Sequence, residues 1–140
     1  MKNPIYLLLI IFILHGCADR APSDIRLEKA TEIKLTKDYI VLRDEYQDMI
    51  QDYCIIYEIK FEDQSSAKLI KNIKRSGFYN SKINPDGRLY DSLFIQKDKK
   101  KAVWCRSEKG YRFNGKEGGT SYSVDLDTVT KVMKYIEMYD

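Results

Sequence analysis

The clearest pattern in the chain is a strict alternation of side chains between Asp52 and Asp63. One set of alternate positions is entirely aromatic or aliphatic: Tyr53, Ile55, Tyr57, Ile59 and Phe61. The other set is mixed: Cys54, Ile56, Glu58, Lys60 and Glu62. Successive side chains of a strand point to opposite faces, so this period predicts a strand whose aromatic face meets a core.

An amphipathic helix is predicted directly after this strand. Its apolar stripe is made by Leu69, Ile70 and Ile73, which recur at helical spacing. Ser65 or Ser66 can cap its start, and Gly77 stands where a left-handed C-terminal cap belongs. The basic side chains that point away from the stripe are Lys68, Lys71 and Arg75. The apolar face of the strand, the apolar stripe of the helix and the single tryptophan are expected to pack together. The predicted core is therefore Tyr57, Ile59, Phe61, Leu69, Ile70, Ile73 and Trp104.

Two hairpins are predicted in the second half. Residues 93–95 and 102–105 are apolar and flank a lysine-rich turn, QKDKKK. Residues 111–113 and 122–126 flank NGKEGG, where glycines suit a tight turn. A further turn is predicted at residues 84–87, because proline presets φ and glycine accepts positive φ.

Two segments fit more than one structure. Residues 31–43 suggest a first, bent strand, but a helical stripe also runs from Tyr39 to Tyr53. Residues 128–139 fit a helix capped by Asp127, yet their β-branched and aromatic side chains favour a strand that completes a meander.

The resulting fold class is α+β: an antiparallel sheet of about five to six strands with one helix packed across it, in the order β-β-α-β-β-β-β. Residues 31–140 form this single domain. Residues 18–30 are polar, contain Pro22 and lack periodicity, so residues 17–30 are expected to be a tether.

Composition and charge exclude several classes of protein. The 140 residues are 44% hydrophobic and 32% charged, which is typical of a folded domain. The formal net charge is +3, or +2 without Lys2, and nothing in that balance calls for nucleic acid. The one histidine, His15, lies in a segment expected to be removed, so mechanisms that need imidazole are excluded.

The N-terminus has the pattern of a secretory signal peptide. The ten residues from Ile5 to Leu14 contain no charge and no helix breaker. This run is shorter than the about 20 residues that a membrane-spanning helix needs, and it fits the apolar region of a signal peptide. The next residues complete the run Leu14-His15-Gly16-Cys17, which resembles the lipobox of bacterial lipoproteins. The resemblance implies that residues 1–16 are removed by signal peptidase II after Gly16, and that Cys17 receives diacylglycerol and an N-acyl chain such as palmitate. His15 departs from the residues usual at its position.

Ala18 follows the lipidated cysteine, where Asp favours retention in the inner membrane of Gram-negative bacteria. By the same resemblance, the protein is expected to be anchored in the outer membrane. Asp19 alone does not match the acidic runs that direct some such lipoproteins to the cell surface, so the protein is expected to face the periplasm. The mature part also resembles small Bacteroides-type lipoproteins in the spacing of YEIKFEDQSSAKLIKNI, Trp104 and SYSVDLDTVTKVMKY. That resemblance transfers no catalytic residue.

Cys54 and Cys105 remain after lipidation of Cys17, and the envelope is oxidising. A disulfide between them and two buried free thiols are both consistent with the sequence. A redox-catalytic pair is not favoured, because the C-x-x-C spacing is absent.

The expected function is contact with a partner. No catalytic residue, metal site or cofactor motif is apparent, and no phosphate-binding loop is present. The first hypothesis is a lipid-anchored, non-enzymatic module for a protein partner of the inhibitor, immunity or assembly-accessory type, with Lys68, Lys71 and Arg75 as candidate contacts. The alternative is a small-molecule or glycan-binding lipoprotein with a tyrosine-lined pocket. A charged helix face that only meets solvent also explains the three basic residues.

Overall fold

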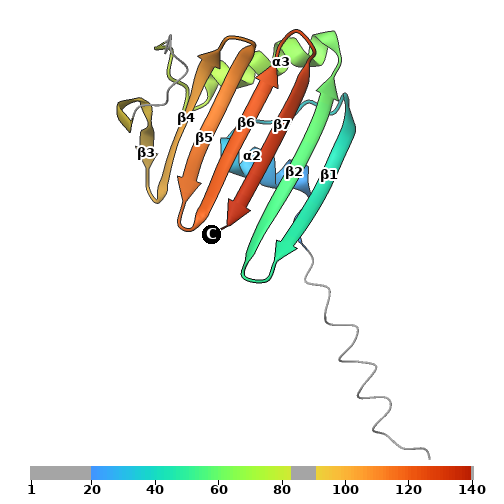
Figure 1. Cartoon of the computed structure of the whole chain (residues 1–140). Helices are drawn as coiled ribbons and strands as arrows, with labels where there is room; N and C mark the ends of the chain where they lie inside the picture. The colour runs from blue at the N-terminus through green and yellow to red at the C-terminus, as the bar shows by residue number, and fades with distance from the viewer. Residues whose placement is uncertain (1–19, 83–90, 140) are drawn as a thin grey trace, which may run out of the picture.

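The computed structural model describes residues 20–82 and 91–139. In this part of the chain, seven strands form one antiparallel sheet, and two α-helices pack on one of its faces (Figure 1). The helices are α2 (Ser23–Thr31) and α3 (Asp63–Arg75). The strands are β1 (Tyr39–Met49), β2 (Asp52–Phe61), β3 (Ile95–Lys97), β4 (Lys100–Ser107), β5 (Gly110–Glu117), β6 (Thr120–Asp127) and β7 (Val132–Tyr139).

The strand order across the sheet is β1-β2-β7-β6-β5-β4-β3. The β1–β2 hairpin comes first, and α3 then carries the chain toward the opposite edge. From there β3 to β7 return as a meander, until β7 pairs with β2 between Tyr53–Tyr139 and Lys60–Val132. The sheet therefore has β1 and β3 as its two edge strands.

The core lies between the sheet and the two helices. Cross-strand pairs such as Tyr57 with Tyr135 and Phe113 with Val124 point toward the helices and are buried. Trp104 is fully buried, and its indole N–H donates to the carbonyl of Thr31 at 3.3 Å. This bond ties β4 to the end of α2.

The sequence predicted the local elements well. The α+β class, the strand after Asp52, the helix of residues 63–75 and the C-terminal strand are confirmed. Six of the seven expected core residues are buried, whereas Ile70 is only partly buried against the core. The helical alternatives for residues 39–53 and 128–139 are wrong.

The expected tether is wrong from Ser23 onward, because these residues form α2 and belong to the domain. Leu27 is fully buried, and Ala30 and Thr31 are buried beside it. Three positions at i, i+3 and i+4 are enough to dock two turns of helix, but they make too short a stripe to stand out in a polar segment.

The expected strand count and element order also need correction. The first strand begins at Tyr39, not near residue 31, and it extends to Met49 through a polar run. The segment before the lysine-rich turn holds a 3-10 turn, Asp91–Leu93, and the short β3. Over residues 20–82 and 91–139, the observed order is α-β-β-α-β-β-β-β-β, with two helices and seven strands.

The expected caps of α3 are wrong as well. Ser65 and Ser66 lie inside the helix and are buried, and Glu62 holds the N-cap position without a side-chain hydrogen bond. The backbone of Gly77 is not left-handed. Its missing side chain leaves room for Lys97, whose Nζ lies 2.0 Å from where a Cβ would stand. The turn predicted at residues 84–87 lies outside the described residues.

Candidate functional site

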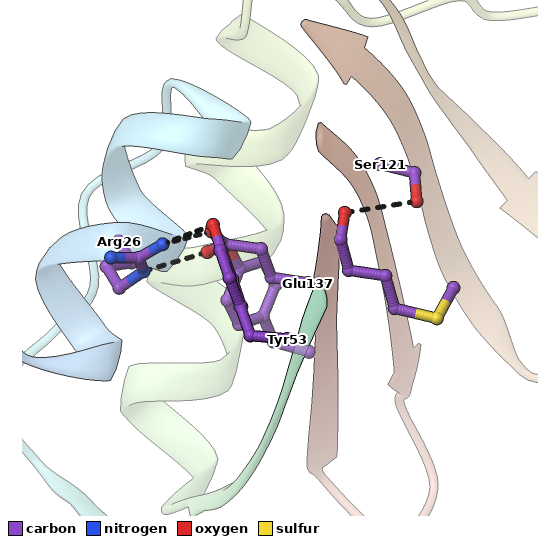
Figure 2. A network of polar contacts seen from close by, with 6 residues as sticks. Arg26, Tyr53, Ser121 and Glu137 are labelled. Carbon is purple, nitrogen blue, oxygen red and sulfur yellow. Dashed lines mark hydrogen bonds and ion pairs between the residues drawn. The ribbon is translucent and has the colours of Figure 1, made fainter. Parts of the chain in front are cut away.

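A buried carboxylate, Glu137 on β7, lies on the sheet face that meets the helices. Its side chain is 3% exposed. Arg26 of α2 pairs with both carboxylate oxygens, with Nε 3.0 Å from Oε2 and Nη2 on Oε1. The hydroxyls of Tyr53 and Tyr135 each donate to the carboxylate at 2.6 Å. Figure 2 shows Arg26 and Tyr53 converging on Glu137 from α2 and β2.

This network has one protonation state at neutral pH. Burial acts to raise the pKa of Glu137, but hydrogen bonds from Arg26, Tyr135 and Tyr53 outweigh burial and lower it. Burial and the bond to Glu137 raise the pKa of Tyr53 to about 12, and the pKa of Tyr135 is raised for the same reasons. The carboxylate is therefore held charged and occupied by donors. The Glu137 carboxylate thus holds α2 on the sheet through Arg26, and its arrangement does not suit proton exchange.

Sequence analysis missed Arg26 and Glu137. The available signal was a charged residue at an alternate position between Tyr135 and Tyr139, on the apolar face of a predicted strand. A carboxylate there needs a buried partner. The partner lies 111 residues away along the chain, so nothing local identified Arg26.

The basic residues singled out in the sequence, Lys68, Lys71 and Arg75, are all exposed on α3. None of them forms an ion pair within the part of the chain that the structure describes. Gly16 and Cys17 lie outside the described residues.

The two remaining cysteines are free and buried, so the candidate disulfide is not formed. Cys54 lies on β2 and Cys105 on β4, with β7, β6 and β5 between them. Four steps of about 4.8 Å separate these strands by about 19 Å, whereas a disulfide needs Cα atoms within about 7 Å. Burial also raises the pKa of the Cys105 thiol. The alternative of two buried thiols is the one that the structure supports.

Exposed apolar side chains concentrate on the edge strand β1 and the turn after it. We call this surface the edge strip, and its members are Ile40, Val41, Leu42, Tyr46, Met49 and Ile50. Ile40 is 67% exposed, and Val41 and Leu42 are about half exposed. Among the described residues, β1 pairs only with β2, so within this part of the chain its outer edge presents unpaired backbone groups beside these side chains.

The sheet face away from the helices carries a ladder of alternating charge. Neighbouring strands contribute Arg43, Glu58, Lys134, Asp125 and Arg112, each opposite the next in register. Two of the steps are ion pairs, Lys134–Glu58 at 3.7 Å and Arg112–Asp125 at 2.6 Å. The ladder itself has three cations and two anions, and Arg43 at its end is paired with Glu45 at 2.6 Å, so the charges of the ladder and Glu45 together cancel.

A depression of about 400 Å³ lies beside the ladder on the same face. Ser121 and Ser123 form part of its floor, and its apolar lining comes from Phe94, Ile136 and Met138. Asn114 also lines it, and the Nδ2 atom of this residue is buried without a hydrogen-bond partner in the described structure. Lys101 and Lys116 stand opposite each other in register at its border. The described residues of this lining supply hydrogen-bond donors and no carboxylate.

Within the described residues, no group of three or more His, Cys, Asp or Glu side chains is arranged to hold a metal ion. The same residues include no helix long and apolar enough to cross a membrane. Comparisons with family models, curated proteins and solved structures found no match to this chain.

Proposed function

We propose that this chain is a lipid-anchored protein of the bacterial cell envelope that acts by binding a protein partner and carries out no catalysis. The run Leu14-His15-Gly16-Cys17 supports lipid attachment at Cys17, and Ala18 supports an outer-membrane position facing the periplasm. The observation that carries the binding role is the edge strip, because it combines exposed apolar side chains with an unpaired strand edge.

The chemistry of the edge strip suits addition of a strand from the partner. An extended segment that pairs with β1 gains main-chain hydrogen bonds, and its side chains cover Ile40, Val41 and Leu42. Soluble domains ordinarily protect such edges with lysine, proline or a covering loop. The N-terminal half of β1 has two features that limit pairing, a bulge between Val41 and Arg43 and the ion pair Arg43–Glu45. Its three consecutive apolar side chains, Ile40, Val41 and Leu42, nevertheless remain exposed.

Charged edge variants test this proposal. Ile40→Lys with Leu42→Lys adds the charges that natural edges use against pairing, and both side chains are more than half exposed, so the fold is retained. Capture of the envelope partner by the tagged lipoprotein is expected to be lost. Retained capture by the double variant would refute the edge as the binding surface.

A matched variant tests the surface that the sequence had favoured. Charge reversal of Lys68, Lys71 and Arg75 changes three exposed basic residues on α3 and leaves the residues of the edge strip unchanged. If an acidic partner binds α3, this reversal lowers capture and its salt dependence. Under the edge-strip proposal, capture is unchanged.

A second candidate function is the binding of a small anionic molecule, and the depression favours it. Its volume lies in the range of small-molecule sites, and it combines the unpaired Asn114 amide and Lys116 with apolar lining from Phe94 and Ile136. It lies on the sheet face away from the helices.

Thermal unfolding against a panel of carboxylates and phosphates tests this second function. A ligand that binds only the folded chain raises the melting temperature, and at a fixed concentration the rise is larger for a tighter ligand. The Lys116→Glu variant is expected to lose that shift, and Lys71→Glu on α3 is the matched control that keeps it. An equal loss in both variants would show nonspecific charge attraction.

A further inference from the structure

Three turns meet at one end of the sheet, which we call the β1–β2 end. The row of paired residues nearest to it runs Tyr53, Tyr139, Thr120, Glu117, Lys100 and Lys97 across six strands. The β1–β2 hairpin reaches beyond the other turns at this end (Figure 1). Its apex is therefore the outermost part of the described domain here.

The apex carries exposed apolar side chains, and one of them stands at a backbone conformation that its residue type disfavours. Ile50 is 98% exposed and Met49 is 49% exposed. Ile50 also has a φ of 72°, in the left-handed region that β-branched residues avoid. Asn or Gly suits such a turn position better. An exposed, conformationally disfavoured isoleucine contributes nothing to the fold, which points to a contact outside the domain.

Aromatic side chains lie next to the apex. Tyr53 stacks between Tyr46 and Tyr139, with ring centroids 5.8 Å apart in both pairs. Tyrosines are enriched at membrane–water interfaces, where the ring meets the lipid and the hydroxyl meets water. Asp48 and Asp52 flank the apex, so anionic lipid would be repelled and a zwitterionic surface is the fitting one.

The lipid attachment site is tied to the same end by chain length. The guanidinium carbon of Arg20 lies 4.0 Å from the centroid of the Tyr46 ring. Arg20 is three positions after Cys17 in the sequence, a span of at most about 11 Å. Ile50 is four residues beyond Tyr46, about 14 Å along the strand. Val129, in the β6–β7 turn, lies at the opposite end of β7, more than about 20 Å from Tyr139 at the β1–β2 end.

We propose that the β1–β2 apex is a second membrane contact, in which Met49 and Ile50 enter the headgroup layer of the bilayer that holds the lipid on Cys17. This inference rests on the proposed lipid anchor. Two contacts fix the orientation of the domain: β1 stands upright from the membrane, and Ile40, Val41 and Leu42 face sideways at a distance from the lipid. The contact thus presents only the part of the edge strip made by Ile40, Val41 and Leu42 to a partner in the envelope, while Met49 and Ile50 are in the membrane.

Lipid quenching of a fluorophore at the apex tests the proposal. The lipidated full chain with Ile50→Cys is labelled with an environment-sensitive fluorophore and reconstituted in phosphatidylethanolamine–phosphatidylcholine vesicles. Val129→Cys is the matched control, because Val129 is an 82% exposed β-branched residue in a turn at the other end. The chain without an added cysteine corrects for labelling of the buried Cys54 and Cys105.

We expect brominated acyl chains to quench most of the fluorescence at position 50 and none at position 129. Equal quenching at both positions, or none at position 50 while the chain floats with the vesicles, would overturn the membrane contact. A chain that does not float with the vesicles would instead overturn the lipid anchor, and the inference would fall with it. Protection of position 50 in detergent without lipid would assign the apex to a second copy.

Discussion

Replacing Arg26 by leucine isolates the contribution of the buried ion pair. Leucine keeps the apolar stem of the arginine but removes the guanidinium that binds both oxygens of Glu137. The carboxylate then stays buried with only the hydroxyls of Tyr53 and Tyr135 as donors. The expected consequence is an uncompensated charge in the core next to α2.

The size of the loss follows from burial. Removing one partner of a buried ion pair costs about 3–5 kcal/mol of unfolding free energy. The Arg26 side chain is 24% exposed, and two donors remain on Glu137, so we expect the lower limit, about 3 kcal/mol. The matched control is Arg112→Leu, because the Arg112–Asp125 pair is about half exposed and such pairs contribute about 0–1 kcal/mol.

The pH dependence of the unfolding free energy gives a second, independent test of the buried pair. In the native chain the pKa of Glu137 is lowered, so its stabilisation is present above the unfolded-state pKa and is lost as the pH falls through the folded-state pKa. In Arg26→Leu, burial is expected to raise that pKa above its unfolded value. The destabilisation then applies at neutral pH and shrinks on acidification, as the carboxyl takes up a proton.

Urea unfolding of the unlipidated chain from residue 17, carrying Cys17→Ser, measures both effects at pH 7 and at about pH 5. The stability difference between the native sequence and Arg26→Leu should narrow at the lower pH. A difference no larger than that of Arg112→Leu, or one that does not change with pH, would refute the buried-pair reasoning.

Three further predictions concern the core, the cysteines and the anchor. Ile73→Ala removes a fully buried side chain and should cost about 2–5 kcal/mol, and Ile70→Ala should cost less because Ile70 is only partly buried; a reversed order in urea midpoints would contradict the packing. Cys54 and Cys105 should react with a thiol reagent only after unfolding, and a bridged species in an intact-mass spectrum would contradict their separation. Cys17→Ser should abolish acyl labelling and release the chain from membranes, so continued labelling with a palmitate analogue would contradict the lipobox assignment.

The parts of the fold that the sequence predicted are those with a strong local period. The alternation between Tyr53 and Phe61 and the stripe of Leu69 and Ile73 depend on neighbours a few residues away, and both are confirmed. The sheet order depends on pairing between distant segments, such as Tyr57 with Tyr135, and no local pattern specifies it. For the same reason, the seven-strand sheet and the docking of α2 were not predicted.

The surfaces were harder to predict than the elements. Ile40, Val41 and Leu42 have the composition of a buried strand, and only the position of β1 at the edge of the sheet leaves them exposed. Cys54 and Cys105 were compatible with a bridge until the sheet order placed three strands between them. In each case the deciding fact is which strand lies beside which.

Site-specific photocrosslinking in intact envelopes tests the central claim most directly. A photoreactive phenylalanine analogue replaces Leu42 on the edge strip in one strain and Lys71 on α3 in another, in the otherwise native lipoprotein. The edge-strip account predicts one discrete protein adduct from position 42, its loss when Ile40→Lys is added, and no adduct from position 71. An adduct from position 71 with none from position 42 would contradict the account and return the binding role to the basic face of α3.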